Sequence, residues 1–145
     1  MYARLRDHQF SLYEDYARKQ GLQGKSLLIL LWIYRHPKGI SQQTITRHTY
    51  STKQVVNAII KNFSKKGYIE STVHPKDRRK KLILLTKKGR QFAASIIDPI
   101  DEAEKKAFSQ LSAKQQQTLI ETTHLFTDVL TQEFIRLTKE ICPDI

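Results

Sequence analysis

The feature that most constrains this fold is a short helix with clear start and stop signals, within residues 51–67. Ser51 is a good N-terminal cap, and Gln54 follows three residues later, as in a capping box. Gly67 suits the position after the last turn, because glycine adopts a left-handed backbone at little cost. The apolar residues between these signals repeat at helical spacing: Val55, Ile59 and Phe63, with Val56 and Ile60 beside them. An amphipathic helix is therefore predicted.

A β-hairpin is predicted directly after this helix. Residues 68–73 and 82–86 are short and rich in β-forming side chains, as strands are. Pro75 lies between them, where it disfavours a helix and fits a turn. Residues 76–81 carry five basic side chains and one acid, Asp77, which predicts a charged and solvent-exposed tip.

Two shorter segments precede the helix. Residues 41–48 are expected to form a short helix capped by Ser41, followed by a turn at Thr49-Tyr50, which together with the next helix is a helix-turn-helix pattern. Residues 25–36 are apolar on nearly all sides and could be a buried strand or a buried helix. A helix is favoured because the pattern continues up to Pro37, and it would lie at the centre of the fold.

Long helices are predicted at both ends of the chain, over residues 3–20 and from Ser112 to about 141. Thr86 is expected to cap a further helix through residue 108, with a kink or interruption near Pro99. The terminal helices leave apolar stripes that most simply form a dimer interface, although the last helix could instead fold back on its own domain. The stripes comprise Leu5, Leu12, Leu119, Phe126, Leu130, Phe134, Leu137 and Ile141.

The positive charge is concentrated in the middle of the chain. Residues 41–90 carry thirteen Lys/Arg against two Asp/Glu, whereas residues 91–145 carry five against nine. This distribution predicts a polyanionic partner. A membrane surface is less well matched, because many basic residues fall in the hairpin and not on an amphipathic helix. No apolar run reaches membrane-spanning length and no signal-peptide pattern begins the chain, so a cytoplasmic protein without a membrane partner is expected.

The polar face of the predicted helix could read DNA in a major groove. Asn and Gln pair bidentately with adenine, and Lys pairs with guanine. A merely solvated helix face would carry the same residue types, and the basic hairpin beside it favours the nucleic-acid interpretation. The candidate residues are Thr52, Lys53, Gln54 and Asn57 for the bases, and Lys61 for a phosphate or minor-groove contact.

Two motifs resemble the MarR family of bacterial winged-helix regulators. The first is Asp77-Arg78-Arg79, followed by Ile83, Leu85, Thr86 and Gly89, which is similar to the family's wing signature. The second, residues 63–69, is similar to the end of the family's recognition helix. The resemblance implies a mainly α fold with a small β-hairpin wing, a DNA-binding lobe at about 25–90, and dimerisation helices at about 1–20 and 91–145. It also implies a homodimer on a pseudo-palindromic operator in double-stranded DNA.

The resemblance assigns roles to the wing. Asp77 would brace the hairpin by pairing with an arginine of that hairpin, and the basic residues would contact the minor groove or its phosphates. These residues are Arg78, Arg79, Lys80 and Lys81. The chain departs from the family pattern at Thr49-Tyr50, where an apolar residue and Gly are frequent, and at Thr46, where Ala is common.

The family also implies an effector pocket for a small molecule, between the dimerisation helices and the DNA-binding lobe. Its candidate lining residues are Phe10, Tyr13, Tyr16 and Trp32, which could equally be plain core. The five histidines form no HxxxH or HxH pair, so no metal or other cofactor is expected. Cys142 is the single cysteine and is expected to be an ordinary terminal thiol.

The expected function is a sequence-specific, homodimeric transcriptional regulator, a repressor released by a small-molecule effector. The alternative is a winged-helix module that binds nucleic acid without sequence preference or binds another protein. An enzyme is not expected, because the sequence has no phosphate loop, no serine elbow and no paired catalytic residues.

Overall fold

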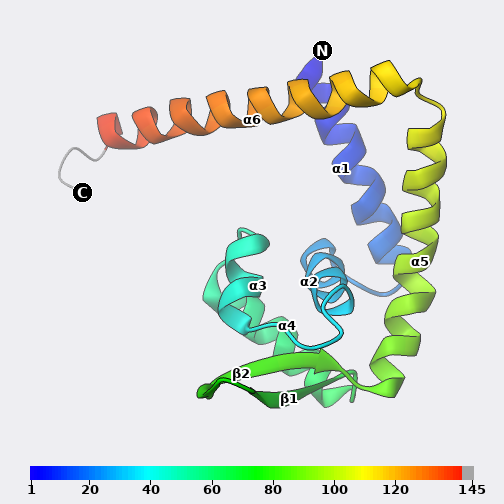
Figure 1. Ribbon diagram of the computed structural model, residues 1–145, viewed down its shortest axis with the longest axis vertical. Coiled ribbons are helices and arrows are strands. Elements are labelled where there is room, and N and C mark those ends of the chain that lie inside the picture. The colour runs from blue at the N-terminus through cyan, green and yellow to red at the C-terminus, as the bar shows by residue number, and fades with distance from the viewer. Residues whose placement is uncertain (142–145) are drawn as a thin grey trace. The chain divides into compact units, whose positions relative to one another are not determined.

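The structure, a computed structural model, describes residues 1–141 (Figure 1). The chain consists of two compact units, Met1–Ile100 and Asp101–Ile145. The fold is mainly helical with one β-hairpin, the wing, as predicted. Its elements are α1 Tyr2–Lys19, α2 Gly24–Tyr34, α3 Gln42–His48, α4 Lys53–Lys65, β1 Ile69–His74, β2 Asp77–Leu85, α5 Lys87–Ser109 and α6 Ala113–Ile141.

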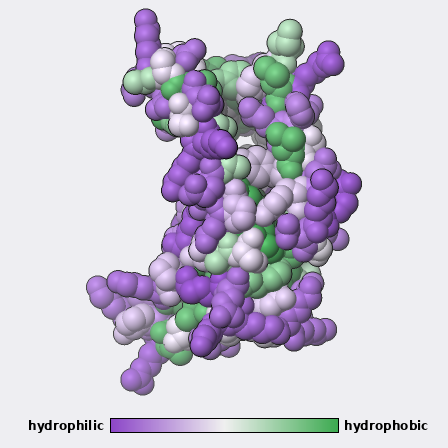
Figure 2. Space-filling model, turned by 90° about the vertical axis from the view of Figure 1, so that its right-hand side faces the viewer, coloured by the Kyte–Doolittle hydropathy of each residue, from purple (hydrophilic) through white to green (hydrophobic). Residues whose placement is uncertain are grey.

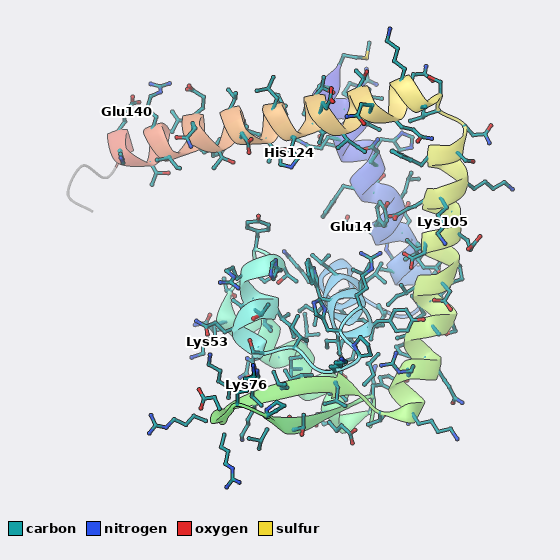
Figure 3. The ribbon with its side chains drawn as sticks, in the orientation of Figure 1. Glu14, Lys53, Lys76, Lys105, His124 and Glu140 are labelled. Carbon is teal, nitrogen blue, oxygen red and sulfur yellow. The ribbon has the colours of Figure 1, made fainter. Side chains whose placement is uncertain are left out.

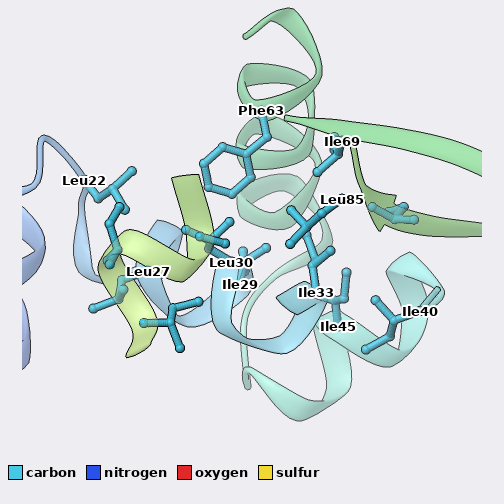
Figure 4. Packing of buried hydrophobic residues seen from close by; sticks show 14 of the residues in the cluster. Leu22, Leu27, Ile29, Leu30, Ile33, Ile40, Ile45, Phe63, Ile69 and Leu85 are labelled. Atoms are coloured by element: carbon cyan, nitrogen blue, oxygen red, sulfur yellow. The ribbon is translucent and has the colours of Figure 1, made fainter. Parts of the chain in front are cut away.

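Helix α2 lies at the centre of the core of the first unit. Its side chains Leu27, Ile29, Leu30 and Ile33 are buried, which confirms the prediction of a helix apolar on nearly all sides. Figure 4 shows residues of other elements that pack around it, including Ile45 of α3, Phe63 of α4, Ile69 of β1 and Leu85 of β2. The helix-turn-helix and the wing are therefore built on one shared core.

The buried face of α4 is rotated slightly from the predicted one. Val56 and Phe63 are buried and Ile59 and Ile60 are half-buried, whereas Val55 is 41 % exposed. The prediction that Val55 belongs to the inner stripe was therefore wrong. The core contacts α4 along the row centred on Val56 and Phe63, which are seven residues and about two turns apart.

The wing is an antiparallel hairpin whose base is joined to the loop before α3. Ile69 pairs with Leu85 and the register continues to Val73, which pairs with Lys81. At the base of the wing, Ile83 also forms a bridge with Ile40, and the two main-chain hydrogen bonds between them measure 2.9 and 2.8 Å. Strand β2 is consequently paired on both of its edges at Ile83.

The tip of the wing differs from the predicted charged loop. The turn consists of Pro75 and Lys76 alone, and β2 already begins at Asp77. Between the pairs Val73–Lys81 and His74–Asp77 the register shifts by three residues. Residues 78–80 therefore form a bulge on β2 and have no partner across the hairpin. The sequence prediction missed this bulge, because sequence patterns alone do not show where the pairing is irregular.

The junction between the wing and α5 is tightly packed. Thr86 caps α5, as predicted, by accepting a hydrogen bond from the main-chain N–H of Gly89 at 3.0 Å. The N–H of Thr86 donates to the carbonyl of Tyr68 at 3.0 Å. Gly89 is buried against that carbonyl, so closely that a β-carbon at position 89 would overlap its oxygen. Glycine is required at position 89 because there is no room for a side chain. Its backbone conformation is not the reason, since the residue lies inside a helix.

Helix α5 passes through Pro99 without a break. The predicted interruption near residue 98 is absent from the described chain, where α5 is a single helix. Its face with Ile96, Ile97 and Ile100 is buried, and the Tyr16 hydroxyl donates to the Ile96 carbonyl at 2.8 Å, close to the proline. These contacts keep the helix continuous where proline removes one of its hydrogen bonds.

Helix α6 in the second unit begins at the predicted cap. The Ser112 hydroxyl accepts from the N–H of Gln115, and the Gln115 side chain accepts from the N–H of Ser112, which is a complete capping box. None of the side chains of α6 that the structure describes is buried. None of the helices within residues 1–141 is long and apolar enough to cross a membrane.

Candidate nucleic-acid interface

The turn between α3 and α4 contains a residue in a glycine-like conformation. Tyr50 has a φ of +49°, in the left-handed region. Its N–H donates to the Arg47 carbonyl at 3.4 Å, and the N–H of Ser51 donates to the Thr46 carbonyl at 3.3 Å. This is a Schellman helix ending with tyrosine where glycine is usual. The side chain is 94 % exposed, so the departure from the family pattern changes the residue and preserves the turn.

The neighbours of Tyr50 complete this turn. Thr49 is only 2 % exposed, and its hydroxyl donates to the Ile45 carbonyl at 2.8 Å, so a polar residue fills the usual apolar position. Thr52 caps α4 by accepting from the N–H of Val55 at 3.3 Å. The prediction of Ser51 as the cap was therefore wrong by one residue: the Ser51 hydroxyl donates instead to the Thr49 carbonyl, at 3.2 Å.

Replacing Tyr50 with glycine is expected to raise the free energy of unfolding by about 1 kcal/mol. A non-glycine residue in the left-handed region costs about 1–3 kcal/mol, and the larger unfolded-state entropy of glycine offsets part of that gain. Urea denaturation followed by circular dichroism measures the change. The reverse substitution Gly21→Ala is the control, because Gly21 has a φ of +75° and open space around it, and it should destabilise the fold. Equal or lower stability of Tyr50→Gly would contradict the expectation.

The DNA-contact residues predicted on α4 lie on its exposed side. Lys53, Gln54 and Asn57, predicted to read bases, and Lys61, predicted to contact phosphates, are all exposed and lie away from the buried face of the helix. Thr52 is exposed as well, but its side-chain oxygen is engaged as the helix cap. The structure thus brings these polar side chains together on the exposed surface of α4.

An open groove of about 1020 Å³ lies between α3 and α4. From α4 it is lined by Lys53, Gln54 and Asn57, three of the predicted residues. Sequence reasoning missed the lining residues that α3 supplies. These are Gln42, Gln43, Thr46 and Arg47. Every lining residue is polar or basic and none is acidic.

The wing presents the other predicted group of residues. Arg78, Arg79, Lys80 and Lys81 are exposed on β2. Asp77 accepts a hydrogen bond from the main-chain N–H of Arg79 at 3.0 Å. Asp77 thus braces the wing through the main chain of Arg79, at the start of the bulge, and not through an arginine side chain as expected. In the view of Figure 3, Lys53 of α4 and Lys76 of the wing turn project on the same side of the first unit.

The charge around these elements is strongly positive. Residues 16–69 contain ten Lys/Arg and no Asp or Glu. In the part of the chain that the structure describes, no ion pair joins Lys53, Lys61 or the basic wing residues to an acid. Neither α3 nor α4 has an acidic residue in its first turn. The surface therefore has uncompensated donors and cations, which suits a polyanion.

The four candidate effector-pocket residues have separate surroundings. Phe10 and Tyr13 are exposed on α1, whereas Tyr16 packs on the core. Trp32 also packs on the core and stacks with His36 and His48, at ring-centroid distances of 5.7 and 4.5 Å. Within residues 1–141, no group of three or more His, Cys, Asp or Glu side chains is placed to hold a metal ion. Cys142 lies outside the described residues.

The predicted dimerisation residues remain largely uncovered within the chain. Leu5 and Leu12 are exposed on α1, and the exposed fractions of the predicted residues on α6 range from 40 % at Leu130 to 61 % at Phe134. Figure 2 shows exposed hydrophobic side chains among hydrophilic ones on one face of the molecule. The remaining members on α6 are Leu119, Phe126 and Leu137, which are also exposed, and Ile141, whose side chain lies outside the described residues.

In the comparison with known families, residues 20–80 match the model of the MarR family. Over this segment the chain is similar to the MarR family. The matched segment includes α2, the helix-turn-helix and the first half of the wing. The MarR family consists of transcriptional regulators and not of enzymes, which agrees with the expectation that this chain is no enzyme.

Individual MarR-like relatives are distant. The chain is 27 % identical over 75 residues to YdcH of Bacillus subtilis (strain 168), an uncharacterised HTH-type transcriptional regulator, and the match spans about half of each protein. The structure of NMB1585, a MarR family regulator from Neisseria meningitidis, matches with a TM-score of 0.77 at 21 % identity, covering 93 % of this chain and 94 % of that chain. The S. aureus MepR–DNA complex matches with a TM-score of 0.75 at 20 % identity, covering 89 % and 93 %. These structures support the fold.

Proposed function

We propose that this chain is a MarR-like, homodimeric, sequence-specific DNA-binding regulator that acts as a repressor. The observation that carries the proposal is the α3–α4 groove, whose lining is entirely polar or basic and lies in a segment free of Asp and Glu. A relative of similar fold, MepR, has been crystallised with DNA. A double helix supplies both the polyanion and the base edges that such a surface can contact.

The two faces of this surface have different roles. Gln54 and Asn57 carry amides that can pair with adenine, so α4 is assigned to base readout in the major groove. Arg78, Arg79 and Lys80 lie in the exposed bulge of the wing, where Asp77 orders the backbone, and are assigned to the minor groove and its phosphates.

The partner proposed for the apolar stripes is a second copy of this chain. Helix α6 has no buried side chain in its described part, yet it carries a row of large apolar residues at helical spacing. A symmetric dimer would bury that row and place two recognition helices on a pseudo-palindromic site. The proposed domain arrangement keeps the DNA-binding lobe at about 25–90 between dimerisation helices at about 1–20 and 91–145.

A small-molecule effector that releases the DNA is proposed from the family resemblance, with Phe10, Tyr13, Tyr16 and Trp32 as candidate contacts. Tyr16 is the member of this set that reaches α5, through its hydrogen bond to Ile96. A ligand beside Tyr16 would therefore act on the helix that leads from the wing toward α6.

The proposal is tested by binding the purified protein to DNA upstream of its own gene and to random DNA, at several salt concentrations. A preference for the upstream fragment, with two protected half-sites about one helical turn apart, is expected. Equal binding to both DNAs with a steep salt slope would support the alternative of a non-specific nucleic-acid-binding module and overturn the proposal.

Asn57→Ala is expected to weaken operator binding about tenfold and to leave binding to random DNA unchanged. The amide is exposed in the groove and is assigned to a base edge, where a bidentate contact contributes about 1–3 kcal/mol of discrimination. Fluorescence anisotropy on both DNAs measures the effect. Asn62→Ala, at an exposed position of α4 that does not line the groove, is the matched control. An equal loss on operator and random DNA would argue against base readout.

Lys80→Ala is expected to weaken binding to operator and random DNA alike. A lysine that neutralises one phosphate contributes about one unit to the slope of log K against log salt, so this slope should fall by about one. Binding titrations from low to physiological salt give the slope. Lys139→Ala removes the same charge in the last turn of α6 and should leave the slope unchanged. An unchanged slope for Lys80→Ala would show that Lys80 in the wing bulge does not contact a phosphate.

A further inference from the structure

A lysine distant in sequence contacts the helix-turn-helix turn. The ammonium group of Lys25 donates a hydrogen bond to the main-chain carbonyl of Thr49 at 3.0 Å. The Ser51 hydroxyl donates to the same carbonyl at 3.2 Å. Thr49 is the C-cap of α3, so its carbonyl belongs to the negative end of the helix dipole, where a cation is favourable. Lys25 therefore closes the end of α3 from outside the helix-turn-helix.

The carbonyl that Lys25 holds directly precedes the unfavourable backbone conformation. Tyr50 follows Thr49 and has a φ of +49°, although its side chain is exposed and gains no packing in return. Such a conformation persists only where the surroundings fix it. The contacts that fix it here are the two Schellman hydrogen bonds and the bonds to the Thr49 carbonyl.

Lys25 can fix this turn because its own backbone is anchored. It is the second residue of α2, whose side chains Leu27, Ile29 and Leu30 are buried in the core. The turn in contrast is short, since only residues 49–52 separate α3 from α4. A change of backbone in this turn would be passed directly to Lys53 and Gln54 in the first turn of α4, which line the groove.

We propose that Lys25 is a positioning residue for DNA recognition, which holds the Thr49–Tyr50 turn and thereby sets the orientation of α4. This inference rests on the proposed function. It assigns Lys25 no contact with DNA, so loss of its charge should change operator affinity without changing the number of phosphates neutralised.

The first test compares Lys25→Met with Lys19→Met, which removes an equal charge from the exposed last turn of α1. Both are measured on operator and random DNA at a temperature at which circular dichroism shows each variant to be folded. Lys25→Met is expected to weaken operator binding about five- to tenfold relative to Lys19→Met, with an unchanged salt slope. A fall of about one in the slope would identify Lys25 as a phosphate contact and overturn the proposal.

The second test uses Tyr50→Gly, which removes the need to hold the turn. In this background, adding Lys25→Met is expected to change operator affinity by less than twofold. Additive losses would mean that Lys25 acts elsewhere and would overturn the proposal.

A readout without DNA separates this inference from the proposed function. Hydrogen exchange of the Tyr50 and Ser51 amides is expected to be about fivefold faster in Lys25→Met than in Lys19→Met. In the double variant that also carries Tyr50→Gly, the exchange rate of the Ser51 amide is expected to return to the slower value. Unchanged exchange would overturn the inference whatever the DNA result. A wild-type protein that prefers no DNA fragment would overturn the proposed function instead.

Discussion

Gly89→Ala is expected to lower the free energy of unfolding by about 3 kcal/mol or more. A β-carbon built on Gly89 would lie 1.8 Å from the carbonyl oxygen of Tyr68. That carbonyl is a main-chain group that accepts the hydrogen bond of Thr86, so it cannot rotate away as a flexible side chain would. Overpacking of a core costs about 1–3 kcal/mol and more where the backbone must move.

The Gly89→Ala variant is measured by urea denaturation at the same protein concentration as the wild type, because the stability of an oligomer depends on concentration. Gly24→Ala is the matched control. Gly24 is also the start of a helix, but the nearest atom to its added β-carbon is Glu14 Cγ at 3.4 Å, an ordinary contact. The control is expected to be neutral or slightly stabilising, since alanine favours helix. Similar stabilities for the two variants would show that the Tyr68 carbonyl moves easily.

Leu130→Glu is expected to convert the proposed dimer into a monomer and to abolish high-affinity operator binding. Leu130 lies in the middle of the apolar row of α6, between Phe126 and Phe134. An unpaired carboxylate in that row would be desolvated in the dimer, and the symmetry of the dimer would bring two such charges into the same interface. A loss of dimer affinity of a hundredfold or more is expected.

Light scattering after size exclusion gives the test, because the dimer should have twice the chain mass of 16.9 kDa. Gln132→Glu is the control, since it adds the same charge two residues later, about 200° around the helix. It should remain a dimer. If Leu130→Glu remained a dimer, the dimer interface would have to lie outside this row. If it remained a dimer but failed to bind DNA, the loss of DNA binding would not be due to loss of the dimer.

The sequence was most informative where burial and helix chemistry agree. Four buried residues of α2 match its all-round apolar pattern, and Ser41, Thr86 and Ser112 cap the helices that they were expected to cap. Caps are predictable because the side chain bonds a main-chain N–H only two or three residues away.

The errors arose where a residue adopted an uncommon local geometry. Tyr50 in a left-handed conformation has no sequence signal, since glycine or asparagine is usual there, and it displaced the cap from Ser51 to Thr52. The face of α4 was assigned from spacing, which could not distinguish Val55 from Val56 before the contact with the core was known.

The candidate site was predicted in part. The exposed positions of α4 and the wing follow from polarity and charge, and the structure confirms their exposure. The contribution of α3 was missed because a seven-residue helix shows too few turns for its outer face to stand out. The bulge at 78–80 also depends on pairing across the hairpin, which no local pattern encodes.

The bridge between Ile40 and Ile83 has a consequence for how the protein measures DNA. It ties the wing to the chain that leads into α3, and Gly39 beside it has a φ of +104° and would clash with Leu82 if it carried a β-carbon. Two main-chain hydrogen bonds thus join the wing base to the segment that leads into the helix-turn-helix and restrict their relative movement. In the proposed complex, the distance between the major-groove contact of α4 and the minor-groove contact of the wing is then set before DNA binds. A duplex whose groove spacing differs must deform to fit, so its stiffness becomes part of what the protein selects.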